Sequence, residues 1–218
     1  MKTIFWNVDT QYDFMRNDET FKGKLAIPDA RAIEGNLEKL TEIAKARNLQ
    51  VVNTADWHNK DTKEIAEKPD FKITFQEHCM QYTKGAEFVP ATNPENLYAI
   101  NWQRPKGFDP NKYRAMKNMG NIVLYKDAFD IFAGNKYTDD VLRILVPEKA
   151  VVYGVATNVC VDYAVTGLLE RNVKVYAVTD AMKELPGCNL EEIFRKWEAK
   201  GAVLTKTDKL LFDLGEVK

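Results

Sequence analysis

A cysteine lies at the centre of residues 151–165, whose sequence is VVYGVATNVCVDYAV. The apolar run 151–153 predicts a buried strand, and a helix capped by Thr157 or Asn158 is expected to follow, with Cys160 in its first turn. Unpaired backbone N–H groups and the positive end of the helix dipole meet there, and both favour a thiolate. Cys160 is therefore a candidate nucleophile. The alternative is a small apolar side chain in a core helix, which free cysteines often are.

Two charged residues follow other apolar runs in the same way. Asp9 comes directly after residues 2–8, and Lys126 comes directly after residues 122–125. If the strands are parallel, both side chains lie at the same edge of the sheet as Cys160. An ammonium at Lys126 would favour the thiolate, and Asp9 could accept the thiol proton and later deliver it to a leaving amine. Together the three residues predict acyl transfer, although alone Asp9 is typical of a turn and Lys126 of a solvated strand end.

A second group of residues suggests a metal site. Asp56 and His58 are two positions apart after the expected strand 49–54, so in an extended segment their side chains point the same way. His78, the other histidine of the chain, could add a third ligand from the polar segment 59–94, which lacks a clear element. Two imidazoles and one carboxylate suit Zn²⁺, Fe²⁺ or Mn²⁺ and leave positions open for water or a ligand atom. As a bare pattern, this spacing is weak.

Apolar runs that alternate with amphipathic segments predict the elements that position these residues. Strands are expected at 2–8, 49–54, 122–125, 151–153, 173–178 and 202–204, with a candidate short strand at 97–101. Helices are expected at 30–47, 137–145, 160–171 and 190–200, and a loop with an irregular helix at 102–120. The repeated order of strand then helix predicts an α/β fold with a mostly parallel sheet of six strands, covered on both faces through right-handed crossovers.

Composition limits the size of the protein and its partners. A chain of 218 residues with 45% hydrophobic content predicts one domain spanning residues 1–218. The formal net charge of −1 provides no basic field for nucleic acid or an anionic membrane, so a small molecule is the expected partner. We expect neither a signal peptide nor a membrane span. Three cysteines are too few for a secreted disulfide scaffold, which favours a cytoplasmic location.

Five segments, in order, resemble the successive motifs of the isochorismatase-like cysteine hydrolases, and within that superfamily they are most similar to nicotinamidases. The segments are VDTQYDF at 8–14, ADWH at 55–58, HCMQYTKGAEF at 78–88, YKDAFDIFAG at 125–134 and GVATNVCVDYAVTGL at 154–168. The resemblance extends from about residue 4 to residue 179. It implies one Rossmann-like domain, a three-layer sandwich of helices around the sheet.

The resemblance also implies a catalytic triad of Cys160, Asp9 and Lys126. It implies a cis peptide bond between Val155 and Ala156, and an oxyanion hole formed by the N–H groups of Ala156 and Cys160. On this reading the thiol attacks a carboxamide carbon, the acid passes a proton to departing ammonia, and water then cleaves the thioester.

The metal-binding branch of the superfamily carries its ligands at positions that match Asp56, His58 and His78. Isochorismatase-type members generally lack this set, so the resemblance favours a nicotinamidase with a divalent metal, zinc first, with iron or manganese as alternatives. In that branch the metal holds the pyridine nitrogen of nicotinamide. A fourth ligand, which some members take from a downstream glutamate, could be Glu64 or Glu67.

Three aromatic residues, Phe14, Trp57 and Tyr163, are expected to contact the substrate ring, with plain core packing as the alternative for each. Two positions depart from the family's pattern: Asn59 replaces the usual proline after the Asp-x-His motif, and Tyr82 replaces the usual glycine. Both changes lie near the pocket, so they bear on substrate identity.

Two other functions remain open from the sequence. One is a different hydrolase of the superfamily, acting on another small amide or on an enol ether such as isochorismate. The other is a catalytically silent binding protein that keeps the fold. The sequence leaves open whether the protein forms a homo-oligomer, because apolar helix faces do not distinguish a dimer surface from a core.

Overall fold

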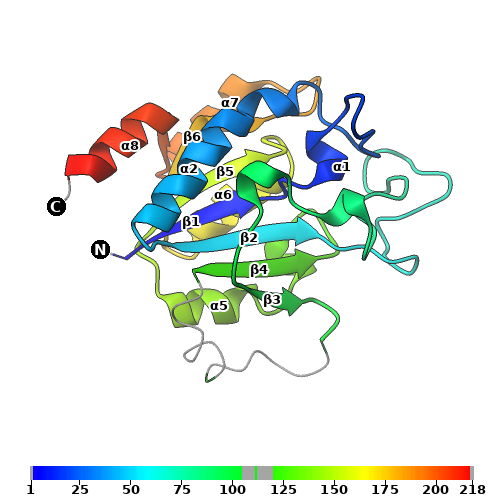
Figure 1. Cartoon of the computed structure of the whole chain (residues 1–218), viewed down its shortest axis with the longest axis horizontal. Coiled ribbons are helices and arrows are strands. Elements are labelled where there is room, and N and C mark those ends of the chain that lie inside the picture. Colours follow the sequence, from blue (N-terminus) through cyan, green and yellow to red (C-terminus); the bar gives the residue numbers. More distant parts are fainter. Residues whose placement is uncertain (1, 105–110, 112–119, 217–218) are drawn as a thin grey trace.

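The computed structural model describes residues 2–104, 111 and 120–216 and is built around one parallel sheet. The strand order is β3-β4-β2-β1-β5-β6-β7, and every adjacent pair is parallel (Figure 1). The strands are β1 (Thr3–Val8), β2 (Gln50–Asp56), β3 (Leu97–Asn101), β4 (Asn121–Lys126), β5 (Lys149–Val155), β6 (Lys174–Lys183) and β7 (Val203–Thr205). The predicted parallel sheet is confirmed. The predicted count of six is wrong, because the short segment Leu97–Asn101 pairs with β4 along its whole length as a seventh strand.

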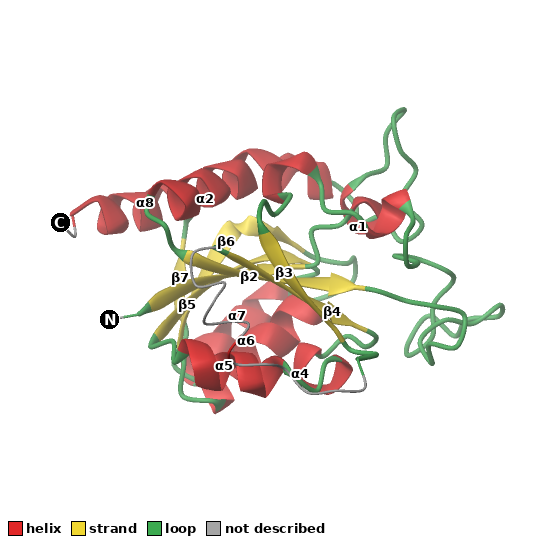
Figure 2. Ribbon diagram, turned by 60° about the horizontal axis from the view of Figure 1, so that its bottom comes forward, coloured by secondary structure: helices red, strands yellow, loops and turns green. Residues whose placement is uncertain are grey.

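Helices cover both faces of the sheet, which confirms the three-layer α/β architecture (Figure 2). One layer contains α1 (Tyr12–Met15), α2 (Glu34–Ala46) and α8 (Thr207–Glu216), and the other contains α4 (Ile131–Gly134), α5 (Thr138–Leu145), α6 (Cys160–Glu170) and α7 (Leu190–Ala199). Short 3-10 helices are η1 (Ala30–Ile33), η2 (Lys84–Ala86) and η3 (Pro90–Thr92). Within the described ranges, none of the helices has the length and apolar character needed to cross a bilayer.

The central strand β1 shows why the sheet is buried on both faces. Trp6 and Val8 join one core with the apolar faces of α5 and α6, while Phe5 joins a second core with the apolar face of α2. Because side chains alternate along a strand, only a continuous apolar run supplies both cores. Each fully buried side chain of this kind contributes roughly 1.5–3 kcal/mol to folding.

The direction of strand addition reverses between β1 and β5. The chain adds β2, β3 and β4 on one side of β1, and then β5, β6 and β7 on the other. In open parallel sheets the crevice beyond the carboxyl ends of the strands at such a point is the usual ligand site. Figure 1 shows the arrowheads of β1, β2 and β4 ending on the same side of the molecule, where α1 and the segment after β2 also lie.

A glycine allows the two strands at this point to approach closely. Gly154 has φ +118, and a Cβ there would lie 2.1 Å from the carbonyl oxygen of Val8. Any other residue would have to push β5 away from β1 directly before Asp9. Gly154 therefore fixes the separation of the two strand ends that carry Asp9 and the segment leading to Cys160.

The turn from β5 into α6 differs from the prediction in its cap. Val159 is the N-cap and makes no side-chain capping bond, so neither Thr157 nor Asn158 has that role. The side chain of Asn158 instead accepts a hydrogen bond from the N–H of Leu185 at 2.8 Å, which ties the turn to the loop after β6. Cys160 lies in the first turn of the helix as predicted, and the Val155–Ala156 peptide bond is cis.

Other differences concern element ends. β6 continues to Lys183, beyond the predicted end at 178, and its register against β5 shifts between Val152 and Gly154. The helices α4 and α8 were not predicted, and the residues predicted as a loop with an irregular helix at 102–120 lie largely outside the described residues. The segment 59–94 contains only the short helices η2 and η3 among its described elements, as its weak periodicity predicts.

Replacing Gly154 by alanine should lower the free energy of unfolding by more than about 2 kcal/mol, because the new methyl group meets the β1 backbone at an unfavourable φ. Urea denaturation measures the change. Gly35→Ala is the matched control: Gly35 lies in α2 with open space around it, so alanine there should stabilise by about 0.5–1 kcal/mol. Equal stability of the Gly154 variant and the wild type would show that β5 has room to move.

Candidate active site

The buried ammonium of Lys126 joins the residues at the carboxyl edge of the sheet. Its Nζ lies 3.0 Å from Asp9 Oδ2 and 3.7 Å from Cys160 Sγ, and it donates a hydrogen bond to Asp56 Oδ1. The side chain is only 1% exposed. Burial disfavours the ammonium, but the carboxylates of Asp56 and Asp9 outweigh this effect and raise the pKa of Lys126 well above its usual range. Lys126 is therefore a permanent positive charge between two acids and a thiol.

The carboxylate of Asp9 is held in a fixed direction. Thr54 Oγ1 donates to Asp9 Oδ1 at 2.6 Å, which leaves Oδ2 facing Lys126. The backbone turns at this residue, with φ 50, immediately after β1 ends. Burial raises the pKa of the Asp9 carboxyl, while Lys126 opposes the rise. The ammonium of Lys126 lies between this carboxylate and the Cys160 thiol, 3.0 Å from Asp9 Oδ2 and 3.7 Å from Cys160 Sγ.

The thiol of Cys160 is neutral at rest. Burial raises its pKa well above the usual range, and Lys126 opposes this only in part. The sequence suggested an easily formed thiolate from the position at a helix start, but the desolvation of a side chain 8% exposed outweighs that effect. Ionisation of the sulfur therefore needs a nearby base, and Asp9 is the acid that shares the Lys126 ammonium with the thiol.

Backbone donors surround the thiol at the start of α6. The N–H groups of Val159 and Val161 both bond to the carbonyl of Ala156, at 3.0 and 3.1 Å. Among the described turn and loop bonds, the N–H groups of Ala156 and Cys160 have no backbone acceptor. The first N–H groups of a helix lack partners within it, and such groups can stabilise an oxyanion. The two donors named from the sequence thus remain available for this purpose.

Four buried side chains converge beside the triad. Asp56, His58, Glu64 and His78 each offer one ligand atom, and these atoms all lie within 4.8 Å of one another. Asp56 Oδ2 lies 3.6 Å from His58 Nε2 and 3.7 Å from His78 Nε2, and Glu64 Oε1 lies 3.8 Å from His78 Nε2. The structure thus gathers the three ligands expected from the sequence and adds Glu64 rather than the exposed Glu67.

The hydrogen bonding of this cluster fits a cation. Both ring nitrogens of His58, the Nε2 of His78 and the Oε1 of Glu64 are buried without a hydrogen-bond partner among the described residues. Buried polar atoms are rarely left so. Of the eight such atoms among the described residues, four lie in this cluster. The other ring nitrogen of His78 bonds to the carbonyl of Gln76 at 2.8 Å, which orients Nε2 toward the cluster. Two nitrogens and two carboxylate oxygens suit a divalent metal.

The charges in the cluster support the same conclusion. Burial and the neighbouring Asp56 carboxylate raise the pKa of Glu64 to about 8. Burial also acts against ionisation of Asp56, but Lys126 and the two imidazoles outweigh it and hold the pKa of Asp56 well below its usual range. The two carboxylate oxygens of Asp56 have different partners: Oδ1 binds Lys126, and Oδ2 faces the imidazoles of His58 and His78. One carboxylate therefore belongs to both the triad and the metal-type cluster.

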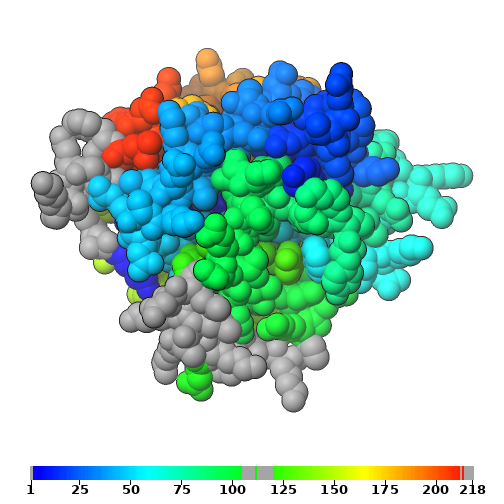
Figure 3. Space-filling model, viewed as in Figure 1, coloured from blue at the N-terminus to red at the C-terminus, as the bar shows by residue number. Residues whose placement is uncertain are grey.

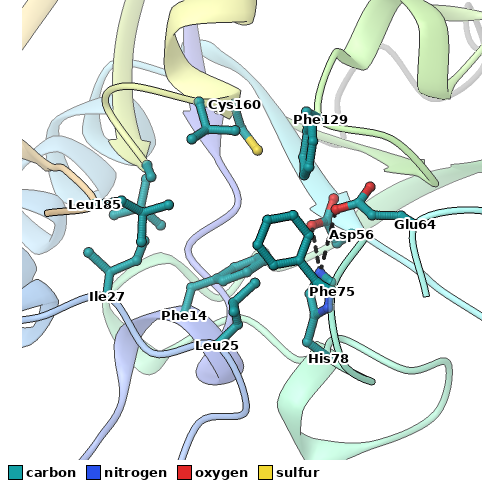
Figure 4. A pocket seen from close by; sticks show the side chains of 13 residues that line it. Phe14, Leu25, Ile27, Asp56, Glu64, Phe75, His78, Phe129, Cys160 and Leu185 are labelled. Atoms are coloured by element: carbon teal, nitrogen blue, oxygen red, sulfur yellow. Dashed lines mark ion pairs between the residues drawn. The ribbon is translucent and has the colours of Figure 1, made fainter. Parts of the chain in front are cut away.

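A cavity of about 430 Å³, including its open mouth, lies between the thiol and the cluster. Figure 4 shows the sulfur of Cys160 directed into it from one side, with Asp56, Glu64 and His78 grouped at another. The remaining lining side chains are apolar: Phe14, Leu25, Ile27, Phe75, Phe129, Val155, Ala156, Val159 and Leu185. Besides the thiol, the titratable groups of the lining are the acids Asp56 and Glu64 and the imidazole of His78. The described lining contains no lysine or arginine.

Of the three aromatic residues expected at the substrate, the structure brings only Phe14 to this cavity. Trp57 lies between Asp56 and His58 in an extended segment, so its side chain points the opposite way and stacks on Tyr125 at 4.4 Å between ring centroids. Tyr163 is 46% exposed on α6 and does not line the cavity. The expectation that Trp57 and Tyr163 contact substrate is therefore corrected by their positions.

Two other phenylalanines take their place. Phe75 and Phe129 pack edge to face at 5.6 Å, and Phe75 also packs against His78. Sequence reasoning missed both, although Phe129 follows Lys126 by three residues within a quoted motif and Phe75 precedes His78 by three. Neither residue lies in a segment with periodic apolar positions, so no sequence pattern indicates where its side chain points.

Replacing Lys126 by methionine should raise the pKa of Cys160 further, because the one positive charge that opposes burial is lost. A rise of one pKa unit makes alkylation of Cys160 by iodoacetamide about tenfold slower at pH 8. Mass spectrometry of the peptides measures the rate, with Cys188 as the partly exposed reference in the same sample and buried Cys79 as a monitor of unfolding. An unchanged Cys160 rate, with Cys79 unlabelled, would contradict the electrostatic role given to Lys126.

Comparison with known proteins identifies the family. The isochorismatase domain matches residues 3–209. The nicotinamidase of Escherichia coli (strain K12) is 24% identical, and the match covers 87% of this chain and 90% of that protein. Among solved structures, the pyrazinamidase of Pyrococcus horikoshii in complex with zinc has a TM-score of 0.73 at 23% identity, covering 94% of this chain and 99% of that one. The N-carbamoylsarcosine amidase from Thermoplasma acidophilum has a TM-score of 0.71 at 24% identity, covering 95% and 98%. The fold is shared with these structures, and the domain match over nearly the whole sequence shows that this chain belongs to the isochorismatase family.

Proposed function

We propose that this protein is a metal-containing cysteine amidohydrolase that converts nicotinamide to nicotinate and ammonia. One observation carries the proposal: an apolar cavity has a thiol paired with an acid on one side and a buried, unsatisfied cluster of metal-ligand type on another. A flat aromatic amide can present its carboxamide to the first and its ring nitrogen to the second. The similarity to a nicotinamidase supports the same choice.

In the proposed reaction, Asp9 accepts the proton of Cys160 as the sulfur attacks the carboxamide carbon. The N–H groups of Ala156 and Cys160 stabilise the oxyanion of the tetrahedral intermediate. Asp9 then passes its proton to the amide nitrogen, the C–N bond breaks and ammonia leaves, which creates a thioester. Asp9 next takes a proton from water, which attacks the thioester carbon. The C–S bond then breaks, and Asp9 returns its proton to the departing sulfur, which restores the thiol. The acid product ionises to nicotinate.

Lys126 stays protonated throughout this cycle and offsets the negative charge that moves between Asp9 and the sulfur. Asp56, His58, Glu64 and His78 would hold a divalent metal, zinc in our proposal, with iron or manganese as alternatives that suit the same donors. A metal at this position would supply a Lewis-acid anchor for the pyridine nitrogen. Phe14, Phe75 and Phe129 would contact the ring, since all three line the cavity.

The charge of the lining favours a neutral substrate over the two anionic alternatives. N-carbamoylsarcosine and isochorismate both carry carboxylates, and the described lining has acids at Asp56 and Glu64 but no cationic side chain to bind one. A silent binding protein is disfavoured by the contacts among Asp9, Lys126 and Cys160, since burying two acids, an ammonium and a thiol together is costly without a use. As a nicotinamidase, the protein would serve NAD salvage, and we expect it in the cytoplasm.

Purified protein should release ammonia from nicotinamide and from pyrazinamide, and far less from N-carbamoylsarcosine. Cys160→Ala should lower the rate by at least about a thousandfold, because no other nucleophile lines the described part of the cavity. A coupled ammonia assay measures both. Equal rates in the two proteins, or release from N-carbamoylsarcosine alone, would remove the nicotinamidase assignment.

Removal of metal should abolish most of this turnover. Without a cation the ring nitrogen has no Lewis-acid anchor, so kcat/KM for nicotinamide should fall by at least about tenfold. Dialysis against a chelator, followed by elemental analysis and return of Zn²⁺, Mn²⁺ or Fe²⁺, tests this. Protein dialysed without chelator is the control. Full turnover after complete metal removal would show that His58 and His78 do not serve substrate binding.

A further inference from the structure

We propose that Gln11 is a positioning residue that holds the backbone of Asp56 in place and thereby sets the metal affinity of the cluster Asp56, His58, Glu64 and His78. The inference rests on the proposed function, because it concerns the metal site of that function. It assigns a role to a fully buried side chain that does not line the cavity and whose described hydrogen bonds go to backbone groups.

The amide of Gln11 uses all its donors on two backbone carbonyls. Its Nε2 donates to the carbonyl of Asp56 and to the carbonyl of Ala86, both at 2.8 Å. Its Oε1 accepts from the N–H of Asp56, also at 2.8 Å. Gln11 therefore binds the peptide groups on both sides of the Asp56 Cα. The side chain is 0% exposed, so none of these bonds competes with solvent.

These bonds replace a strand that is missing at this point. β1 pairs with β2 only as far as Val8 and Thr54, because the chain turns away at Asp9. Asp56, the last residue of β2, therefore has β4 on one side and no strand on the other. The Gln11 amide occupies that vacant side and makes the donor and acceptor bonds that a neighbouring strand would have made. Without it, the N–H and C=O of a buried residue would lose their partners.

The position of Asp56 has to be exact because its two carboxylate oxygens face different partners. Oδ1 binds Lys126 and Oδ2 faces the imidazoles of His58 and His78. A small rotation of the backbone would move one oxygen away from its partner. The third Gln11 bond, to Ala86, links this arrangement to the segment that leads away from His78. One amide thus connects the ligand on β2 with the segment that carries a second ligand.

The test compares metal affinity in folded variants. Gln11→Met keeps a similar length and removes every bond, and Gln11→Asn keeps the amide but is one methylene too short to reach Asp56. Each should weaken Zn²⁺ binding by about 10- to 100-fold, as loss of a partner that orients a ligand typically does. Competition with a chromophoric chelator measures this without substrate. Circular dichroism and thermal unfolding identify the folded variants, and either variant suffices.

Asn53→Leu is the matched control. Asn53 is also a buried amide of β2, 2% exposed, and it accepts from Asn7 Nδ2 at 3.0 Å and donates to the carbonyl of Ile122 at 3.2 Å. Its loss should destabilise the fold while Zn²⁺ affinity stays within about twofold. If Asn53→Leu loses stability but keeps its Zn²⁺ affinity, weaker Zn²⁺ binding in a Gln11 variant is not explained by lost stability alone.

The outcomes separate the two proposals. Weaker Zn²⁺ binding in a Gln11 variant but not in Asn53→Leu supports the positioning role. Wild-type affinity in a folded Gln11 variant, or equal weakening in Asn53→Leu, overturns that role and leaves the proposed function intact. Failure of the wild type to bind any divalent metal overturns the metal site of the proposed function and the inference with it.

Discussion

The interaction on which the site depends is the contact of one buried ammonium with the carboxylates of Asp9 and Asp56. Burying charges costs several kcal/mol per ion unless each is paired, and Lys126 pairs with both. Glu64 adds a third buried carboxyl to the same region. Burial, and after it the Asp56 carboxylate, raise its pKa to about 8, and Lys126 offsets this only in part. A divalent cation among the four cluster residues would restore balance. The triad and the metal-type cluster are therefore one electrostatic unit that shares Asp56.

A few features of the fold bring the residues of this unit together from distant parts of the sequence. Parallel strands place the residues that follow β1, β2, β4 and β5 at one edge, and the reversal of strand addition between β1 and β5 opens a crevice there. Gly154 brings β5 close to β1, so that the acid after one strand meets the thiol after the other. Two side chains outside the cavity lining, Thr54 and Gln11, then bind the carboxylate of Asp9 and the backbone of Asp56.

The sequence predicts the parts of this arrangement that follow from strand ends. Asp9, Asp56 and Lys126 each come at or just after the end of an expected strand, and this pattern is sufficient to place them together once the strands are parallel. The seventh strand was only a candidate, because a run as short as Leu97–Asn101 is a weak pattern. The extra helix α8 was not predicted, since its segment follows directly on a three-residue strand.

The other features of the site could not be predicted from the sequence, and each has a physical reason. The pKa of Cys160 depends on how far burial outweighs Lys126, which no spacing reveals. The resemblance led to the expectation that Trp57 contacts the substrate ring, yet strand alternation points it away from the cavity. Leu25, Ile27 and Phe75 reach the cavity from irregular segments, where neither a period of 2 nor one of 3.6 is present to indicate orientation. The statement that residues 1–218 form one domain stays a prediction.

The long irregular segment after β2 has a consequence for how an ion would enter and leave. Figure 3 shows this segment, coloured cyan to teal, projecting from the body of the molecule. It contributes Glu64, Phe75 and His78, and the N–H of Phe75 bonds to the carbonyl of Glu64 at 2.7 Å. An ion bound to Glu64, His78 and Asp56 would connect the segment to the sheet. Its dissociation rate would then be governed by the opening of that segment rather than by the strength of its bonds alone, so a captured ion would exchange slowly.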